Sequence, residues 1–196
     1  MKSHFFAYLS KIRWIQRWGL KRNAVAENVM EHSWEVAVIS HALAVIKNRY
    51  FDGNLDVNAI AVAALFHDCG EILTGDMPSP IKYHSPEITK SYKLIEKQAE
   101  QELLNLLPAE LQNDYRSVML EEEVPVENKS IIKAADTISA YLKCKMELAA
   151  GNKEFAIAER DIEAKLKSLD MPEVQYFLAT FTSSYALTLD ELFRKS

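Results

Sequence analysis

The apolar run AVAALF ends in a histidine and an aspartate, His67 and Asp68, and this junction constrains the fold more than any other feature of the sequence. The run has the composition of a buried helix, so an imidazole and a carboxylate lie at the end of a buried element. Burying a carboxylate without a partner is costly, whereas a bound divalent cation turns the same group into a ligand and offsets the cost. We therefore expect a metal ion at this junction.

The rest of the chain has the periodicity of helices joined by short connections. No segment alternates convincingly with strand period, and with only five glycines in 196 residues there is no flexible linker and no repeat of fixed length. The predicted fold class is therefore all-α, a single-domain helical bundle over residues 1–196. The expected helices span 3–14, 30–49, 56–70 with Asp56 as N-cap and most sides buried, 86–107, 127–150, 153–169 and 172–184, with an ordered loop at 75–80.

Composition excludes several classes of protein. A net charge of −5 argues against a general surface for nucleic-acid polymers, which are held by clustered lysine and arginine. No apolar run approaches the roughly 20 uncharged residues of a membrane-spanning helix, and the N-terminus lacks the core of a signal peptide. We expect a cytoplasmic protein with no membrane partner. Cys69 and Cys144 have no CxxC spacing and are expected to be reduced core residues.

Two further residues extend the predicted metal site. Asp136 lies in the apolar segment IIKAADTISAYL without an obvious cationic partner, and His32 lies near the start of the predicted second helix. Taken singly, each has a plainer explanation, such as an exposed histidine or an aspartate bonded to a buried hydroxyl. Together with His67 and Asp68 they form a set of two imidazoles and two carboxylates on three helices. That set suits one divalent transition metal, with manganese, cobalt, iron and zinc all compatible.

Four residues near this set are candidates for chemistry on a substrate. Glu71 follows Asp68 by three residues, so it projects beside the ligands as a general acid or base for a metal-activated water, unless it is a surface glutamate. Arg17 is suited to bind a phosphate bidentately, and Trp18 offers a flat wall to a sugar or base, although isolated residues of these types more often pack. Asp76 can accept a hydrogen bond from a substrate hydroxyl or cap a turn.

The order of a lone histidine, a later His-Asp pair and a distant aspartate resembles the HD-domain metal-dependent phosphohydrolases. The stretches RWGLKRN, AENVMEHSWEVA, FHDCGEILTGDMPSPIKY and KAADTISAYLKCKMELAAGN are similar to those of the bacterial 5′-deoxynucleotidases, and the resemblance covers nearly the whole chain. It implies an HD-type helical bundle with a central metal site, and a homodimer. It also implies hydrolysis of deoxyribonucleoside 5′-monophosphates with one divalent metal and little base preference.

The resemblance also assigns roles by position. It implies His32, His67, Asp68 and Asp136 as metal ligands, with His32, Asp68 and Asp136 also near the substrate, Glu71 as the catalytic acid, Arg17 as the phosphate-orienting arginine, and Trp18, Asp76, Met77, Pro78 and Ser79 as sugar contacts. Selectivity against ribonucleotides would follow if Trp18 and the Asp76 loop leave no room for a 2′-hydroxyl. An apolar wall alone rejects an added hydroxyl by only about 10²-fold, so a steric clash has to supply the rest.

Two alternatives remain open from the sequence. One keeps the HD site but changes the substrate to a deoxynucleoside triphosphate, a cyclic nucleotide or a guanosine alarmone. The other is a non-catalytic, metal-stabilised helical module, against which the presence of both Glu71 and Arg17 argues. The apolar C-terminal stretch VQYFLATFTSSYALTL would contribute to a subunit contact if it is partly exposed.

Overall fold

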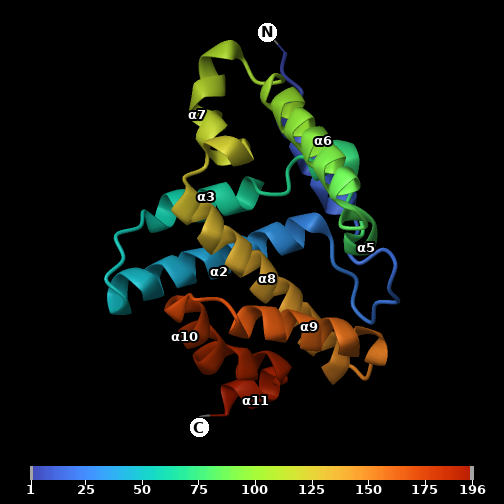
Figure 1. The fold of residues 1–196 in the computed structure, drawn as a ribbon, viewed down its shortest axis with the longest axis vertical. Helices are drawn as coiled ribbons and strands as arrows, with labels where there is room; N and C mark the ends of the chain where they lie inside the picture. The colour runs from blue at the N-terminus through green and yellow to red at the C-terminus, as the bar shows by residue number, and fades with distance from the viewer. Residues whose placement is uncertain (1, 195–196) are drawn as a thin grey trace.

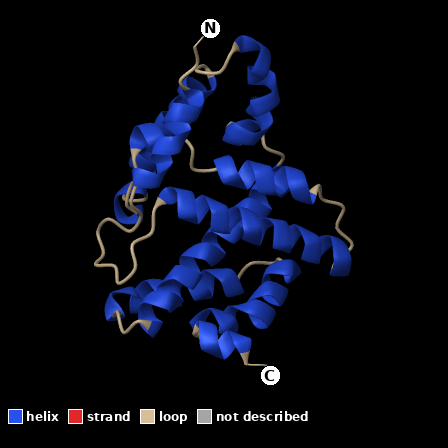
Figure 2. Cartoon of the chain, turned by 180° about the vertical axis from the view of Figure 1, so that it is seen from behind, coloured by secondary structure: helices blue, strands red, loops and turns tan. Residues whose placement is uncertain are grey.

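The computed structural model of the protein describes residues 2–194, and over that range it forms helices and no β-strand, as Figure 2 shows from behind. Three helices, α2, α3 and α8, cross the middle of the molecule, with α6 and α7 at the N-terminal end and α9 to α11 at the C-terminal end (Figure 1). The α-helices are α1 Phe5–Leu9, α2 Val29–Tyr50, α3 Val57–Phe66, α4 Glu71–Thr74, α5 Ser79–Lys82, α6 Pro86–Leu104, α7 Ala109–Met119, α8 Val126–Ala149, α9 Ala156–Lys167, α10 Pro172–Phe181 and α11 Leu189–Phe193. The 3₁₀ turns are η1 Ser10–Trp14, η2 Glu121–Glu123, η3 Lys153–Phe155 and η4 Thr182–Ala186.

Helix α2 begins with a capping box that fixes where its first turn starts. The Asn28 side chain accepts hydrogen bonds from the backbone amides of Met30 and Glu31, and the Glu31 carboxylate accepts one from the Asn28 amide. Both interactions satisfy amides that a helix start leaves without partners. They also fix the orientation of the turn that carries His32.

The loop between η1 and α2 is held against the body of the molecule by a buried ion pair on α8. The Glu147 carboxylate accepts hydrogen bonds from the amides of Ala24 and Val25, and Lys143 donates to both Glu147 and the Val25 carbonyl. The side chains of Lys143 and Glu147 are 4% and 0% exposed, so the loop is anchored by fully desolvated charges. Removing one partner from such a pair is strongly destabilising.

The apolar interior consists of two clusters with the His-Asp junction between them. The larger cluster combines α2, α3, α8 and α10 and includes Ala63, Ala64 and Ala135. The smaller one joins Phe5, Cys69, α6 and α7. Along the chain, Asp68 therefore lies between Ala64 of the larger cluster and Cys69 of the smaller one. Both cysteines are buried and free, as predicted.

The structure confirms the all-α fold and corrects several details of the prediction. Helix α3 is capped by Asp56 as expected but ends at Phe66, and it is not buried on most sides, because Val62 and Leu65 are 42% and 45% exposed. His4 rather than Ser3 is the N-cap of α1, although Ser3 Oγ still accepts from the Phe5 amide. Helices α5, α7 and α11 were not predicted, and α5 takes the end of the expected 75–80 loop.

The stretch Val57–Thr74 is apolar enough to pass a test for membrane-spanning helices, with a mean hydropathy of 1.3 over 18 residues. It is not one continuous helix, because α3 ends at Phe66 and α4 begins at Glu71. The turn between them carries His67 and Asp68. The composition of this stretch thus reflects a helix of the fold followed by the candidate site.

Candidate metal centre

Three helices bring the two histidines and two aspartates of the predicted set together. His32 lies in the first turn of α2, His67 and Asp68 follow α3, and Asp136 lies in the middle of α8. Ligand atoms of His32, His67 and Asp68 all lie within 4.8 Å of one another. Asp136 is not in that group of three, but its Oδ1 lies 3.1 Å from His32 Nε2, and it lines the same cavity as His67 and Asp68. The cluster is able to hold a metal ion.

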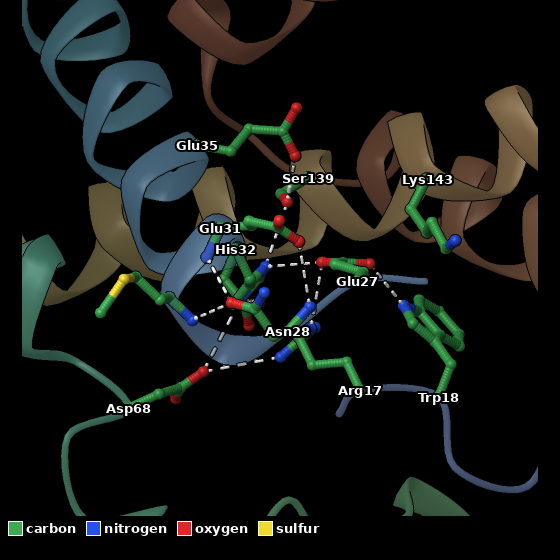
Figure 3. Close-up of polar contacts among 12 residues, drawn as sticks. Arg17, Trp18, Glu27, Asn28, Glu31, His32, Glu35, Asp68, Ser139 and Lys143 are labelled. Carbon is green, nitrogen blue, oxygen red and sulfur yellow. Dashed lines mark hydrogen bonds and ion pairs between the residues drawn. The ribbon is translucent and has the colours of Figure 1, made fainter. Parts of the chain in front are cut away.

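The hydrogen bonds of the two imidazoles fix which ring nitrogen faces the cluster. His67 Nδ1 lies 2.7 Å from the Ala64 carbonyl oxygen, which can only accept, so Nδ1 carries the proton. Ser139 Oγ donates its proton to Glu35 Oε2 at 2.6 Å, so it accepts from His32 Nδ1 at 3.1 Å. When the rings are neutral, both Nε2 atoms then present lone pairs to the cluster; the His32 ring is drawn in Figure 3.

Those two Nε2 atoms are also buried without a hydrogen-bond partner within residues 2–194. His67 Nε2 lies 3.1 Å from Asp68 Oδ2, and His32 Nε2 lies 3.6 Å from the same oxygen. Leaving buried nitrogens unsatisfied costs about 1–3 kcal/mol each. A divalent cation bonded to both imidazoles and to Asp68 removes this cost, so the donor set fits a metal, with the other ring nitrogens held as metal-ligating histidines usually are.

The charges of the cluster shift the acidities of its members. Burial opposes ionisation of Asp68, but the neighbouring His67, His32 and Arg17 outweigh it and hold the pKa of Asp68 well below its usual range. Burial likewise opposes the charge on His32, but the adjacent carboxylates of Asp136 and Glu27 outweigh it and raise the pKa of His32 to about 9, so without a bound metal ion the ring also takes a proton on Nε2. Asp68 is therefore ionised at neutral pH, as a ligand must be, and a metal ion that binds His32 would displace the second proton of its ring.

Arg17 and Trp18 lie beside the cluster because a single carboxylate holds both (Figure 3). Glu27 Oε1 is 3.2 Å from Arg17 Nε, and the Trp18 indole donates to Glu27 Oε2 at 3.0 Å. Arg17 also reaches Asp68 Oδ2 at 3.6 Å. Trp18 has a left-handed backbone with φ of 60°, a conformation that costs free energy for a bulky residue and marks a functional loop in many proteins.

Glu71 begins α4 and lines a cavity of about 250 Å³ together with His67, Asp68 and Asp136. Its Oε2 atom is buried without a hydrogen-bond partner within residues 2–194. Burial, followed by the negative charges of Asp68 and Asp76, raises the pKa of Glu71 to about 9. Without a bound metal ion, these surroundings favour the protonated form of the Glu71 carboxyl.

The remaining predicted contacts lie in the loop after α4 and do not line that cavity. Burial raises the pKa of Asp76, while the charge of Arg17 and the Trp18 amide lower it. Met77 and Pro78 are half-buried, and Ser79 is exposed at the start of α5. The structure thus places Asp76 in the electrostatic surroundings of Arg17 and leaves Met77, Pro78 and Ser79 outside the lining of the cavity at the cluster.

A family model described as 5′-deoxynucleotidase YfbR-like matches residues 4–185 of this chain. The chain belongs to this family. The 5′-deoxynucleotidases of Yersinia pestis strain Pestoides F and of Yersinia pseudotuberculosis strain IP 31758 are each 51% identical to it over 190 residues, covering 97% of this chain and 96% of theirs.

Solved structures of HD-domain phosphohydrolases share the fold of this YfbR-like chain. The protein from Listeria innocua has a TM-score of 0.80 at 24% identity, covering 93% of this chain and 88% of its own. The cyanophage S-2L HD phosphohydrolase DatZ, solved with dA and one catalytic Zn²⁺ ion, has a TM-score of 0.65 at 25% identity, covering 92% of this chain and 95% of its own.

Three residues of this centre are not found by the sequence analysis. Glu27 contacts Arg17 and Trp18, and its Oε1 is 3.5 Å from His32 Nδ1. Ser139 and Glu35 form the chain of hydrogen bonds that fixes the His32 ring. The sequence did contain a signal for two of them. Glu35 follows His32 by three residues and Ser139 follows Asp136 by three, and residues three apart lie on the same face of a helix.

Proposed function

We propose that the chain hydrolyses the 5′-phosphate of deoxyribonucleoside monophosphates, giving a deoxynucleoside and phosphate. One observation carries the proposal: two buried imidazole Nε2 atoms, each with its Nδ1 already bonded, converge on Asp68 beside the guanidinium of Arg17. An acceptor-rich pocket for a cation next to a donor for phosphoryl oxygens is what cleavage of a phosphomonoester requires. Family membership at 51% identity to 5′-deoxynucleotidases supports this substrate class.

His32, His67, Asp68 and Asp136 would hold one divalent metal ion, for which zinc, manganese, cobalt and iron are candidates. When bound, such an ion supplies a Lewis acid for phosphoryl oxygens and lowers the pKa of water. The Zn²⁺ ion in DatZ favours zinc among these metals. Substrate oxygens near the ion would also lie near His32, Asp68 and Asp136.

The remaining residues would bind, orient and protonate the substrate. Arg17 donates to the phosphoryl oxygens, and its contacts to Glu27 and Asp68 hold the guanidinium in place. Water forms the new bond to phosphorus as the bond from phosphorus to the 5′-oxygen breaks. Glu71 gives its proton to that oxygen, and one proton of the attacking water restores the Glu71 carboxyl, so the products are the deoxynucleoside and hydrogen phosphate. The raised pKa of Glu71, about 9, supports the role of acid. Trp18 and residues Asp76 to Ser79 would contact the sugar.

The test is phosphate release from deoxyadenosine and adenosine 5′-monophosphates, a 3′-monophosphate and a deoxynucleoside triphosphate, with chelator and then with each metal restored. Release from the deoxy 5′-monophosphate alone, lost with chelator, is the expected result. Equal release from the ribonucleotide would refute the proposed selectivity. Preference for the triphosphate would refute the substrate class, and no release by metal-loaded protein would refute the activity.

We further propose a homodimer in the cytoplasm. The C-terminal segment exposes apolar side chains, with Leu189 and Phe193 being 67% and 77% exposed, which supports burial against a second copy. Free, buried Cys69 and Cys144 are compatible with a reducing compartment. Light scattering should give the mass of a dimer for the wild type and of a monomer for Leu189→Asp. A wild type that remains monomeric at all concentrations would contradict the proposed dimer. Recovery of the protein outside the cytoplasmic fraction would contradict the proposed location.

A further inference from the structure

A second, wider cavity adjoins the one at the metal centre. It has a volume of about 880 Å³, against about 250 Å³ for the cavity lined by His67, Asp68, Glu71 and Asp136. The two cavities share Tyr83, Lys93, Glu100, Glu121 and Lys129 as lining residues. The metal centre therefore adjoins a recess of the size that small-molecule ligands occupy.

Lysines from two helices surround this double recess. Lys90 and Lys93 lie on α6, and Lys129 and Lys133 lie near the start of α8. No carboxylate within residues 2–194 lies within 4.0 Å of the ammonium group of any of these four. Their charges are therefore available to a ligand.

The other charged groups of the recess are already engaged or partly neutral. Lys82 pairs with Glu96 and Lys97 with Glu122, each at 2.6 Å. The Glu100 carboxylate accepts a hydrogen bond from the backbone amide of Glu121. Burial raises the pKa of Glu100 to about 7, which reduces the negative charge of Glu100 near neutral pH. Glu121 remains as an exposed opposing carboxylate. The lysines without a carboxylate partner thus dominate the mouth.

The charge of the whole chain makes this placement informative. A net charge of −5 repels a doubly negative phosphomonoester, and Asp68, Glu71 and Asp136 line the cavity at the cluster. A local group of positive charges at a recess attracts an anion in spite of the net charge and raises association rates by about 10- to 10³-fold. Lysines at the mouth of a recess that ends at a metal centre are placed to do this.

We propose that Lys93, Lys129 and Lys133 form an anion-binding entrance that captures phosphomonoester dianions and delivers them to the metal centre. The proposal rests on the proposed function, because the captured ligand is its substrate. The entrance acts on association rather than on bond cleavage. It therefore contributes to kcat/KM and not to kcat, and the contribution is screened by salt over a Debye length of about 8 Å at physiological ionic strength.

The test compares two double charge reversals in the full-length, metal-loaded enzyme. Lys93→Glu with Lys129→Glu alters the entrance. Arg160→Glu with Lys167→Glu makes the same change of charge on exposed residues of α9, at the opposite end of the molecule from α6 (Figure 1). Steady-state rates with deoxyadenosine 5′-monophosphate are measured from low salt to about 0.5 M salt, where the Debye length is a few ångströms.

The entrance variant should lose about tenfold in kcat/KM at low salt, keep kcat within about twofold, and approach the wild type at high salt. The α9 variant should follow the wild type throughout. Equal salt curves for the two variants would overturn the proposal, and so would a loss in kcat that salt does not change. Equilibrium binding of the same nucleotide, measured over the same salt range, repeats the comparison without turnover. A wild type that binds the nucleotide without hydrolysing it would contradict the proposed function, while the salt dependence of the dissociation constants would still decide the entrance.

Discussion

Replacing Glu27 by alanine removes a carboxylate that contacts the Arg17 guanidinium and the Trp18 indole at the same time. The Arg17 and Glu27 side chains are only 13% and 14% exposed, so their pairing is not the weak interaction of a surface salt bridge. Loss of the indole hydrogen bond to the ionised Glu27 carboxylate costs about 1.5–3 kcal/mol, and loss of the ion pair with Arg17 adds a cost of similar size. Because the contacts are neighbours, the two costs do not add fully.

A total near 3 kcal/mol, expressed in the transition state, lowers kcat/KM by about 10²-fold at about 1.4 kcal/mol per factor of ten. Glu27→Gln keeps one acceptor oxygen, which can serve either Arg17 or Trp18 but not both, so it should cost about tenfold. Metal content should stay at the wild-type level in both variants, because the ligands themselves are intact. The assay is steady-state hydrolysis of deoxyadenosine 5′-monophosphate, with metal measured per chain and folding checked by circular dichroism.

Glu31→Gln is the matched control for this comparison. Glu31 lies in the same turn of α2 as His32, is exposed, and contributes its carboxylate to the capping box rather than to Arg17. It should lower the free energy of unfolding by about 1 kcal/mol or less and leave kcat/KM unchanged. If folded, metal-loaded Glu27→Ala keeps kcat/KM within about threefold of the wild type, Glu27 does not position the arginine.

Other perturbations test separate parts of the structure. Glu71→Gln should lower kcat by at least about 10²-fold while metal content stays constant, and a parallel loss of metal would instead make Glu71 a ligand. Removing the metal should lower the melting temperature, because the native state alone presents the assembled site, and an unchanged melting temperature after chelation would argue against a bound metal. Burial opposes ionisation of Glu147, but Lys143 and backbone amides outweigh it and lower the pKa of Glu147 from 4.5 to about 2. The ionised Glu147 therefore stabilises the folded chain above pH 4.5, and this stabilisation is lost as the pH falls toward 2. Urea unfolding of Glu147→Gln should therefore depend less on pH in that window, and parallel curves would contradict this. Burial raises the pKa of Glu100 from 4.5 to about 7, so the folded chain should lose stability as the pH rises between those values, and Glu100→Gln should flatten that decline.

Three of the four candidate ligands, His67, Asp68 and Asp136, were predictable as a cluster because each is a polar residue in an apolar setting. The apolar run before His67 and the helix around Asp136 both require burial, and buried carboxylates need partners. The sequence did not show which partner Asp136 finds, because His32 comes from α2 and reaches α8 only through tertiary packing. Polar residues that conflict with their local pattern are thus good indicators of a site, and poor indicators of its exact contacts.

Glu27 was missed for a different reason. It lies in a loop without periodicity, and its contacts depend on how residues 17–28 fold back, with Arg17 donating its amide to the Glu27 carbonyl. Loops of this kind are set by specific hydrogen bonds rather than by hydrophobic pattern, so a pattern does not reveal their geometry. The sequence therefore indicated Arg17 and Trp18 but not the residue that holds them.

Helix α7 was missed because its sequence is mostly polar and short. Tyr115 and Val118 pack against the smaller apolar cluster, and Met119 is buried within it. Helices of this length are stabilised mainly by such tertiary contacts, which are not visible in one sequence. For α3 the prediction of burial was wrong in the opposite direction. Its apolar composition suggested that most of its sides are buried, but the neighbouring helices do not cover every side.

The two histidines of the metal centre differ in whether substitutions at other positions can alter the hydrogen bond that orients each ring. His67 is oriented by a main-chain oxygen, that of Ala64, which every residue at position 64 would supply. His32 is oriented by the side chains of Ser139 and Glu35, so exchanges at two positions outside the ligand set can alter its hydrogen bonding. Selection or engineering can therefore adjust the preference of the site for one metal over another through Ser139 and Glu35, while all four candidate ligands and the reaction they support stay the same.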